Sequence, residues 1–326
     1  MFTCEMKVIE HLKNATKPLL NFEITPPERG GDIDKDLEVV SNLKKYNPSF
    51  IHVTSRAADS ERKEIEPGVY EEKIRRKRPG TLGLCTRINF EHKIDTVCHV
   101  VCKGFDQQET EDFLIELDYG KMRNILAIQG DENSYQKPLK PGRSINKYAS
   151  DLIKQISDMN QGRYLEDLLD ARPTDFCIGG ACYPEKHYMS PNPEKDMEVL
   201  KIKIDSGMQY AISQMFFDNN KYFDFVESCR KNGITIPIIP GITTLVSKKQ
   251  LEGPKGIPAK FHCLIPPSLS KKIEEAEKED VKKIAIDWTT KQAQELINQG
   301  VPSVHFFIYG NSNSIIEAVD NLRFFP

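Results

Sequence analysis

Short apolar runs alternate with longer amphipathic segments along almost the whole chain. The runs are rich in β-branched and aromatic residues, which is typical of buried strands. The segments between them carry apolar residues at helical spacing, and several end on glycine, the usual C-terminal stop of a helix. The apolar runs occupy residues 19–25, 50–55, 97–102, 124–130, 176–183, 210–217, 236–242 and 303–310.

This alternation predicts parallel strands joined by crossover helices. Eight such units are the number that closes a (β/α)8 barrel of the TIM type, and a chain of 326 residues has a suitable length. We therefore predict a single catalytic β/α barrel domain over residues 1–326. An open, doubly wound sheet is the alternative that the pattern leaves open. No glycine-rich dinucleotide or P-loop motif follows a predicted strand, which disfavours a Rossmann or P-loop site.

Two segments interrupt the regular alternation. Residues 55–82 form a highly charged insertion in which the pattern predicts no strand. Its basic run KIRRKRPG is of a kind found in nucleic-acid contacts, but the acidic residues just upstream favour a solvated loop or helix end. Residues 129–147 form a long polar loop after the fourth predicted strand. In a barrel this loop lies on the C-terminal face, where active sites are built, so we expect an active-site loop there.

Composition narrows the classes of partner. The chain holds 45 basic and 48 acidic residues, for a net charge of −3, which argues against nucleic-acid or membrane-surface binding. We find no secretory signal and no apolar run of membrane-spanning length, so we expect a cytoplasmic protein with its eight cysteines reduced. Cys98, His99 and Cys102 are residue types that bind metals. Because side chains alternate along a strand, His99 points to the opposite face from the two cysteines, and we predict no metal site.

Polar residues cluster at the ends of the predicted strands, which in a barrel meet on one face. They are Glu23, Thr54, His99, Gln129, Asp131, Tyr183, Glu185, His187, Gln214, Asp218 and Asn311. This set indicates a barrel enzyme that acts on a small polar molecule. A lyase or aldolase barrel is disfavoured because no lysine lies within the strand runs, and a non-enzymatic interaction module would not explain so many polar strand ends.

Glu23 is the most informative of these residues because it lies between Phe22 and Ile24 and precedes Pro26. Burial in such a run raises the pKa of a carboxyl group and suits it to general acid catalysis near neutral pH. The alternative is a buried glutamate paired with a lysine or arginine elsewhere in the barrel. Asp131 could equally be an Asx-turn residue, and Gln214 could hydrogen-bond either a ligand or a neighbouring strand.

Seven segments in register resemble the methylenetetrahydrofolate reductase family in its short bacterial form. They are FEITPP (22–27), GD (130–131), YASDL (148–152), YPEKH (183–187), LKIKIDSG (200–207), SQMFFDN (213–219) and IIPGI (238–242). The resemblance runs from about residue 19 to residue 310. It implies a catalytic barrel without the regulatory domain of the animal enzymes.

The resemblance also implies a reaction. FAD would be held at the C-terminal ends of the strands, reduced by NAD(P)H, and used to reduce 5,10-methylenetetrahydrofolate to 5-methyltetrahydrofolate for methionine synthesis. Folate and the nicotinamide dinucleotide would be the small-molecule partners, and assembly into a homo-oligomer is a further expectation.

Residue roles follow from the resemblance position by position. Glu23 matches the family's general acid, and Asp131 matches an acidic residue close to both flavin and folate. Gln214 and Gln250 match substrate contacts. The positions that match FAD contacts are Thr54, His99, Gly130, Asp131, Tyr148, Ala149, Tyr183, His187, Asp196 and Lys203.

Two departures from the family pattern stand out. Gln129 replaces an arginine that normally precedes Gly130, and Asn311 stands where the family often has a folate-binding arginine. They leave a second hypothesis open: a divergent barrel that binds a flavin or a pterin but has weak or lost folate reductase activity.

Overall fold

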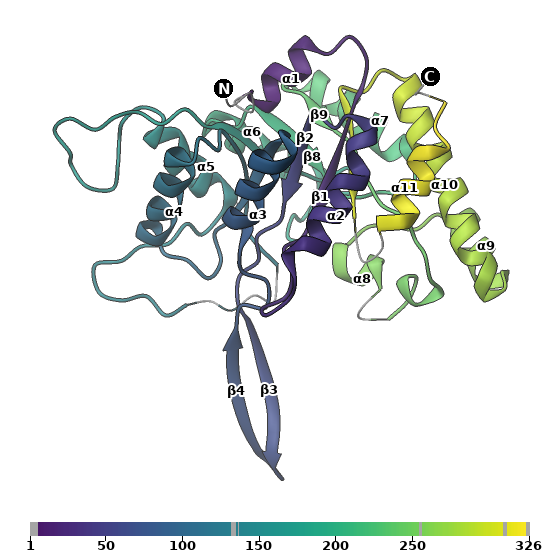
Figure 1. Cartoon of the computed structure of the whole chain (residues 1–326), viewed down its shortest axis with the longest axis horizontal. Helices are drawn as coiled ribbons and strands as arrows, with labels where there is room; N and C mark the ends of the chain where they lie inside the picture. The colour runs from purple at the N-terminus through teal and green to yellow at the C-terminus, as the bar shows by residue number, and fades with distance from the viewer. Residues whose placement is uncertain (1–5, 132–134, 136, 254–255, 309–311, 324–326) are drawn as a thin grey trace.

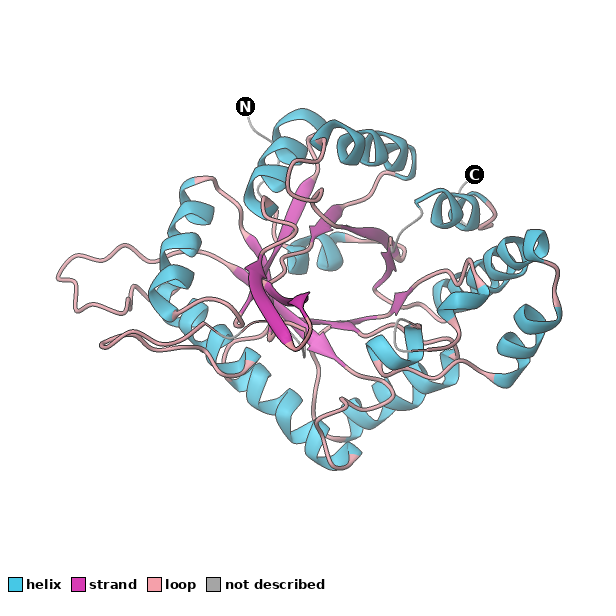
Figure 2. Cartoon of the chain, turned by 90° about the horizontal axis from the view of Figure 1, so that it is seen from below, coloured by secondary structure: helices cyan, strands magenta, loops and turns pink. Residues whose placement is uncertain are grey.

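A parallel sheet rolled into a ring forms the centre of the protein, with helices outside it (Figures 1 and 2). The computed structural model describes residues 6–131, 135, 137–253, 256–308 and 312–323. The sheet order is β10-β11-β1-β2-β5-β6-β7-β8-β9. These strands are β1 (Leu19–Ile24), β2 (Phe50–Val53), β5 (Asp95–Val101), β6 (Asn124–Ile128), β7 (Cys177–Cys182), β8 (Tyr210–Ser213), β9 (Ile238–Ile239), β10 (Gly241–Ile242) and β11 (Ser303–Phe307). The predicted β/α barrel is confirmed.

The seventh predicted run forms two short strands because Pro240 interrupts it. A proline has no backbone N–H to give to a ladder. β9 pairs with β8 on one side of this residue, and β10 pairs with β11 on the other. The carbonyl of Pro240 accepts a hydrogen bond from the His305 N–H at 2.9 Å. The ring is thereby closed through one interrupted strand, and eight predicted runs give nine strands.

The helices return the chain from the end of one strand to the start of the next. Several begin at a side-chain cap, such as Asp32, Asp106, Asn192 and Asp218, which satisfies a free N–H of the first turn. The helices are α1 (Val8–Asn14), α2 (Ile33–Leu43), α3 (Thr81–Arg87), α4 (Gln107–Tyr119), α5 (Ala149–Met159), α6 (Pro193–Asp205), α7 (Asn219–Lys231), α8 (Ile257–Phe261), α9 (Pro267–Glu275), α10 (Lys278–Asn298) and α11 (Ser312–Asp320). Within the described residues, no helix combines the length and apolar character needed to cross a membrane.

The charged insertion after β2 contains a β-hairpin, so the prediction that it holds no strand is wrong. β3 (Asp59–Glu66) and β4 (Val69–Arg75) pair antiparallel and project away from the barrel (Figure 1). The turn between them is Pro67-Gly68, with Gly68 at a φ of 78°. Proline followed by a glycine of positive φ suits a type II turn. Nearly all side chains of β3 and β4 are exposed, so the two strands do not need the apolar alternation by which a buried strand is recognised.

The interior of the barrel has an apolar lower layer and a polar upper layer. The lower layer is filled by large side chains from alternate strands, including Phe50 of β2, Leu126 of β6 and Tyr210 of β8, and Val8 of α1 packs against this layer. The next inward position along β2 after Phe50 is His52, and the next inward position along β5 after Val97 is His99. Since side chains alternate across a strand, the polar layer lies at the C-terminal end of the barrel.

Candidate active site

Glu23 lies in the polar layer at the mouth of the barrel. Its neighbours Phe22 and Ile24 point outward into the main core, so the carboxyl group points inward. One carboxylate oxygen lies 3.5 Å from Nε2 of His305 and 3.7 Å from Nε2 of His99. The side chain keeps 18% of its surface exposed. A ligand entering from the mouth can therefore reach this carboxyl group.

The pKa of Glu23 differs from the sequence-based expectation. Burial raises the pKa of this carboxyl group. The contact with His305 and the charges of His99 and Arg56 lower the pKa, and together they outweigh the effect of burial. The net pKa lies below the ordinary value for a glutamate, so the prediction of a raised pKa is wrong. The alternative was a lysine or arginine in direct contact; among the described residues, the side chains that contact the Glu23 carboxylate are the imidazoles of His99 and His305. In the absence of ligand, Glu23 is a carboxylate at neutral pH.

Two histidines of this cluster, His52 and His305, were not among the candidates from sequence. Nδ1 of His52 lies 3.1 Å from Nε2 of His99, and the His52 and His305 rings meet edge to face at 4.7 Å. Burial lowers the pKa of His99 to about 4 and that of His52 well below the usual range. The signal was present in the strand runs FIHVTS and SVHFFIYG, where each histidine sits at an inward position.

A second group of predicted residues gathers at the end of β7. The rings of Tyr183 and His187 meet edge to face at 4.4 Å. Asp196 of α6 accepts hydrogen bonds from the backbone N–H of His187 and the hydroxyl of Ser190, at 3.0 and 2.9 Å. This carboxylate therefore fixes the turn that carries the two rings. Burial lowers the pKa of His187, so its ring is neutral at pH 7.

Lys203 brings a positive charge to the same group. Its side chain is 9% exposed, and Nζ donates to the carbonyl of Ala181 at 2.9 Å and lies 5.7 Å from the centre of the Tyr183 ring. Burial lowers the pKa of this ammonium group. An ammonium group has three donors, so Lys203 retains donors for an anionic ligand.

The loop after β6 carries another set of predicted residues. Gly130 has a φ of 99°, and a side chain there would press on Lys103. The carbonyl of the exposed Asp131 accepts from Nζ of Lys103 at 2.7 Å. Tyr148, also exposed, precedes Ala149 at the start of α5, where Ala149 is buried. The described part of 129–147 contains no helix or strand, as the predicted loop requires.

The chain resembles known proteins in both sequence and fold. The family model for methylenetetrahydrofolate reductase matches residues 7–323. The chain belongs to this family. It is 28% identical over 317 residues to the 5,10-methylenetetrahydrofolate reductase of Buchnera aphidicola subsp. Schizaphis graminum, covering 95% of this chain and 92% of the relative. It is 24% identical over 326 residues to methylenetetrahydrofolate reductase (NADH) 1 of Arabidopsis thaliana, covering 97% of this chain and 51% of the relative.

The chain thus spans about half the length of several curated reductases that it matches. A solved structure with the same fold is described as an uncharacterized protein from Clostridium thermocellum that binds two copies of 5-methyl-5,6,7,8-tetrahydrofolic acid. Its TM-score is 0.60 at 15% identity, over 96% of both chains. This likeness shows the barrel fold.

Other residues expected from the family pattern have structural partners in this chain. The side-chain carbonyl of Gln214 accepts from the N–H of Met215 at 2.8 Å. That of Gln250 accepts from the N–H groups of Val246 and Ser247 at 2.7 and 3.0 Å. In both glutamines, these bonds engage the amide oxygen and leave the amide nitrogen to serve as donor. Asn311 lies outside the described residues.

Three further residues at strand ends differ in whether their side chains already have hydrogen-bond partners. The Thr54 hydroxyl oxygen is buried and has no hydrogen-bond partner among the described residues. Asp218 caps α7, and Glu185 accepts a hydrogen bond from the N–H of Leu264 at 2.9 Å, so both side chains stabilise local structure.

Cys98 lies in the outer core whereas His99 faces inward, as strand alternation predicts. Within the described part of the chain, no three His, Cys, Asp or Glu residues are grouped to hold a metal ion.

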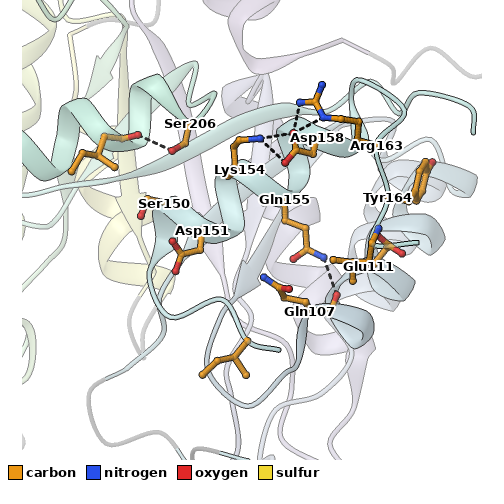
Figure 3. Close-up of a pocket in the computed structure, with 13 residues that line it drawn as sticks. Gln107, Glu111, Ser150, Asp151, Lys154, Gln155, Asp158, Arg163, Tyr164 and Ser206 are labelled. Atoms are coloured by element: carbon orange, nitrogen blue, oxygen red, sulfur yellow. Dashed lines mark hydrogen bonds and ion pairs between the residues drawn. The ribbon is translucent and has the colours of Figure 1, made fainter. Parts of the chain in front are cut away.

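A surface hollow of about 740 Å³ lies on the outer flank of the barrel, over α4, α5 and α6 (Figure 3). Three of its charged groups are engaged with one another, and Glu111 and Asp151 accept hydrogen bonds from backbone N–H groups. Asp158 binds Lys154 at 2.5 Å and is also ion-paired with Arg163, while Gln155 donates to the carbonyl of Gln107 at 2.8 Å. This hollow is separate from the Glu23 cluster, and its satisfied polar groups offer little to a polar ligand.

Proposed function

We propose that the protein is a flavoenzyme that uses NAD(P)H and FAD to reduce 5,10-methylenetetrahydrofolate to 5-methyltetrahydrofolate, a step that feeds methionine synthesis. The observation that carries this proposal is the reachable Glu23 carboxyl group at the mouth of a barrel of this family. The tetrahydrofolate named in the Clostridium thermocellum structure supports a folate substrate.

The residues at the mouth are suited to hold FAD. Lys203 has donors available beyond its bond to Ala181, and the buried Thr54 hydroxyl has no partner in the part of the chain that the structure describes. Charged and neutral donors of this kind fit the phosphates and ring carbonyls of a flavin dinucleotide. When bound, FAD supplies the hydride chemistry of the reaction. The residues that would hold it are Thr54, His99, Gly130, Asp131, Tyr148, Ala149, Tyr183, His187, Asp196 and Lys203.

The remaining residues would act on the folate. Gln214 and Gln250 would orient the substrate through their amide nitrogens, because their carbonyl oxygens are engaged with backbone N–H groups. Asp131 would lie close to both flavin and pterin. Glu23 would supply the proton that opens the methylene bridge, and its carboxylate would then stabilise the cationic iminium form of the substrate.

The test begins with the purified protein and FAD. We expect a yellow complex with flavin absorbance bands at micromolar FAD. Anaerobic NAD(P)H should bleach these bands, and 5,10-methylenetetrahydrofolate should restore them with formation of 5-methyltetrahydrofolate. A colourless protein that takes up no FAD would refute the proposal.

A second candidate is a divergent barrel that binds a flavin or a pterin without folate turnover. The observation in its favour is Gln129, whose amide nitrogen donates to the carbonyl of Lys147 at 3.1 Å, at a position where the family has arginine. A protein that binds FAD and is bleached by NAD(P)H, yet is not reoxidised by the folate, would identify this second function.

A further inference from the structure

A chain of hydrogen bonds fixes the orientation of His305 beside Glu23. The Ser303 hydroxyl donates to the carbonyl of Leu19 at 3.0 Å, so its oxygen is left to accept. The Asn21 amide nitrogen donates to that oxygen at 2.7 Å and to the carbonyl of Val304 at 3.3 Å. The amide oxygen of Asn21 must therefore face Nδ1 of His305, with which it is in hydrogen-bond contact.

This orientation determines which nitrogen of His305 carries a proton. An amide oxygen only accepts, so Nδ1 of His305 is the donor in its contact with Asn21. In a neutral imidazole the other nitrogen, Nε2, then has a lone pair. Nε2 lies 3.5 Å from the Glu23 carboxylate, an arrangement that is repulsive unless a further proton lies between the two groups.

We propose that His305, positioned by Asn21, shares one proton with Glu23 and returns it to the carboxyl group for substrate protonation. This inference rests on the proposed reductase function. It resolves a conflict in the site, because a carboxyl group whose pKa is held low makes a poor general acid without a proton donor beside it. A shift of about 0.5 Å brings the two groups within hydrogen-bond range.

The step balances in protons and electrons. Glu23 takes the shared proton from Nε2 of His305 and gives it to N10 of the bound folate. The bond between N10 and the bridge carbon breaks with its electron pair going to nitrogen, which leaves an iminium ion at N5. Glu23 is then a carboxylate beside a cation, and His305 is neutral and still donates to Asn21. A proton from solvent restores the pair after turnover.

The other titratable groups around Glu23 are less suited to this role. His99 from β5 lies farther away, at 3.7 Å, and its Nε2 already contacts Nδ1 of His52 from β2. Arg56, after β2, acts on Glu23 only through its charge and is not a proton donor at neutral pH. In His305, Nδ1 donates to Asn21 and Nε2 faces the Glu23 carboxylate, so this imidazole needs a second proton on Nε2.

The pH dependence of the folate half-reaction tests the proposal. In the FAD-bound wild type, the rate should fall with rising pH in a limb that belongs to the Glu23–His305 pair. In His305→Gln this limb should move to lower pH, because the carboxyl group then has no imidazole beside it to supply the proton. Asn21→Asp should move it up, because a charged acceptor holds the imidazolium more tightly.

A matched control removes a different buried imidazole. His52→Gln removes the contact with His99 and the edge-to-face contact with the His305 ring, but it leaves the polar contacts of His305 with Asn21 and Glu23 in place, so the limb should keep its position. Flavin reduction by NAD(P)H in every variant reports whether the proposed reductase site is intact. Loss of flavin reduction in the wild type overturns the proposed function, whereas an unmoved limb in His305→Gln overturns only the role of His305.

Nitrogen NMR of the ligand-free, histidine-labelled protein gives a readout without turnover. The His305 signals are those missing in His305→Gln. At neutral pH we expect both ring nitrogens of His305 to carry protons in the wild type, and Nε2 to lose its proton in Glu23→Gln. An unprotonated Nε2 in the wild type would contradict the shared proton.

Discussion

Glu23 can be tested as the general acid by separating the two half-reactions. Glu23→Gln keeps the size and hydrogen-bonding capacity of the side chain but cannot donate a carboxyl proton. We expect the folate half-reaction to slow by about 10²–10⁴-fold, the usual contribution of general acid catalysis. Flavin reduction by NAD(P)H needs no acid there and should keep its rate. Stopped-flow absorbance measures both steps, and equal losses in the two would exclude this role.

The sequence pattern predicted that Glu23 and His99 lie at the mouth of the barrel, but it did not predict that they contact each other. Strand ends could be recognised from local pattern, because each polar residue follows its own apolar run. The partners of Glu23 come from β5 and β11, far apart in the chain. Their effect on the pKa of Glu23 depends on distances that only the closed barrel sets. Desolvation alone, which can be inferred from sequence, gave the wrong direction.

Gln129→Arg tests whether the departure from the family weakens the FAD site. A hydrogen bond to a charged group contributes about 1.5–3 kcal/mol against about 1 kcal/mol for a neutral one, so FAD should bind about 2- to 30-fold more tightly. The arginine can keep the bond to the carbonyl of Lys147. Arg143 does not fill the position in the ligand-free protein, because it is paired with Asp106 at 3.5 Å. FAD titration at low and high salt provides the measurement; weaker binding that recovers with salt would mean that another cation is already present.

At the scale of elements, helices and barrel strands were predictable because each carries its own hydrophobic period. The hairpin β3–β4 does not, since it has no buried face. Its pairs join opposite charges across the strands, such as Glu61 with Lys73 and Lys63 with Glu71. Such cross-strand pairs favour a ribbon without a core. The usable sequence signal was Pro67-Gly68 between two runs that are rich in alternating charge.

Shortening this hairpin should leave the barrel stable. Replacing residues 61–73 by Asn-Gly keeps the pair Ser60 and Ile74 and supplies a favoured two-residue turn. Because the removed side chains are mostly exposed and exposed ion pairs contribute little, the free energy of unfolding should change by less than about 1 kcal/mol. Urea denaturation measures this. A loss of several kcal/mol would mean that the hairpin stabilises the barrel directly.

The barrel as a whole depends on matching side chains between neighbouring strands. The eight runs were enough to predict ring closure, but not which residue of one strand fills the space left by another. Gly179 of β7 is in register with Tyr210 of β8, and the Tyr210 ring lies where a Gly179 side chain would be. Gly180 is similarly covered by Met208. The glycines of FCIGGACY therefore make room for large residues at the start of the next strand.

A pair of glycine substitutions tests this packing. Gly179→Ala places a methyl group against the fully buried Tyr210 ring and should destabilise the protein by about 1–3 kcal/mol. Gly83→Ala is the matched control, because Gly83 lies in α3 and no atom of the described residues comes within 4 Å of the added methyl group. Alanine is the better helix former by about 1 kcal/mol, so this variant should be more stable than the wild type. Urea unfolding of the two variants should therefore move in opposite directions. If Gly179→Ala unfolds at the wild-type midpoint, the tyrosine can move aside and the inner layer is not closely packed.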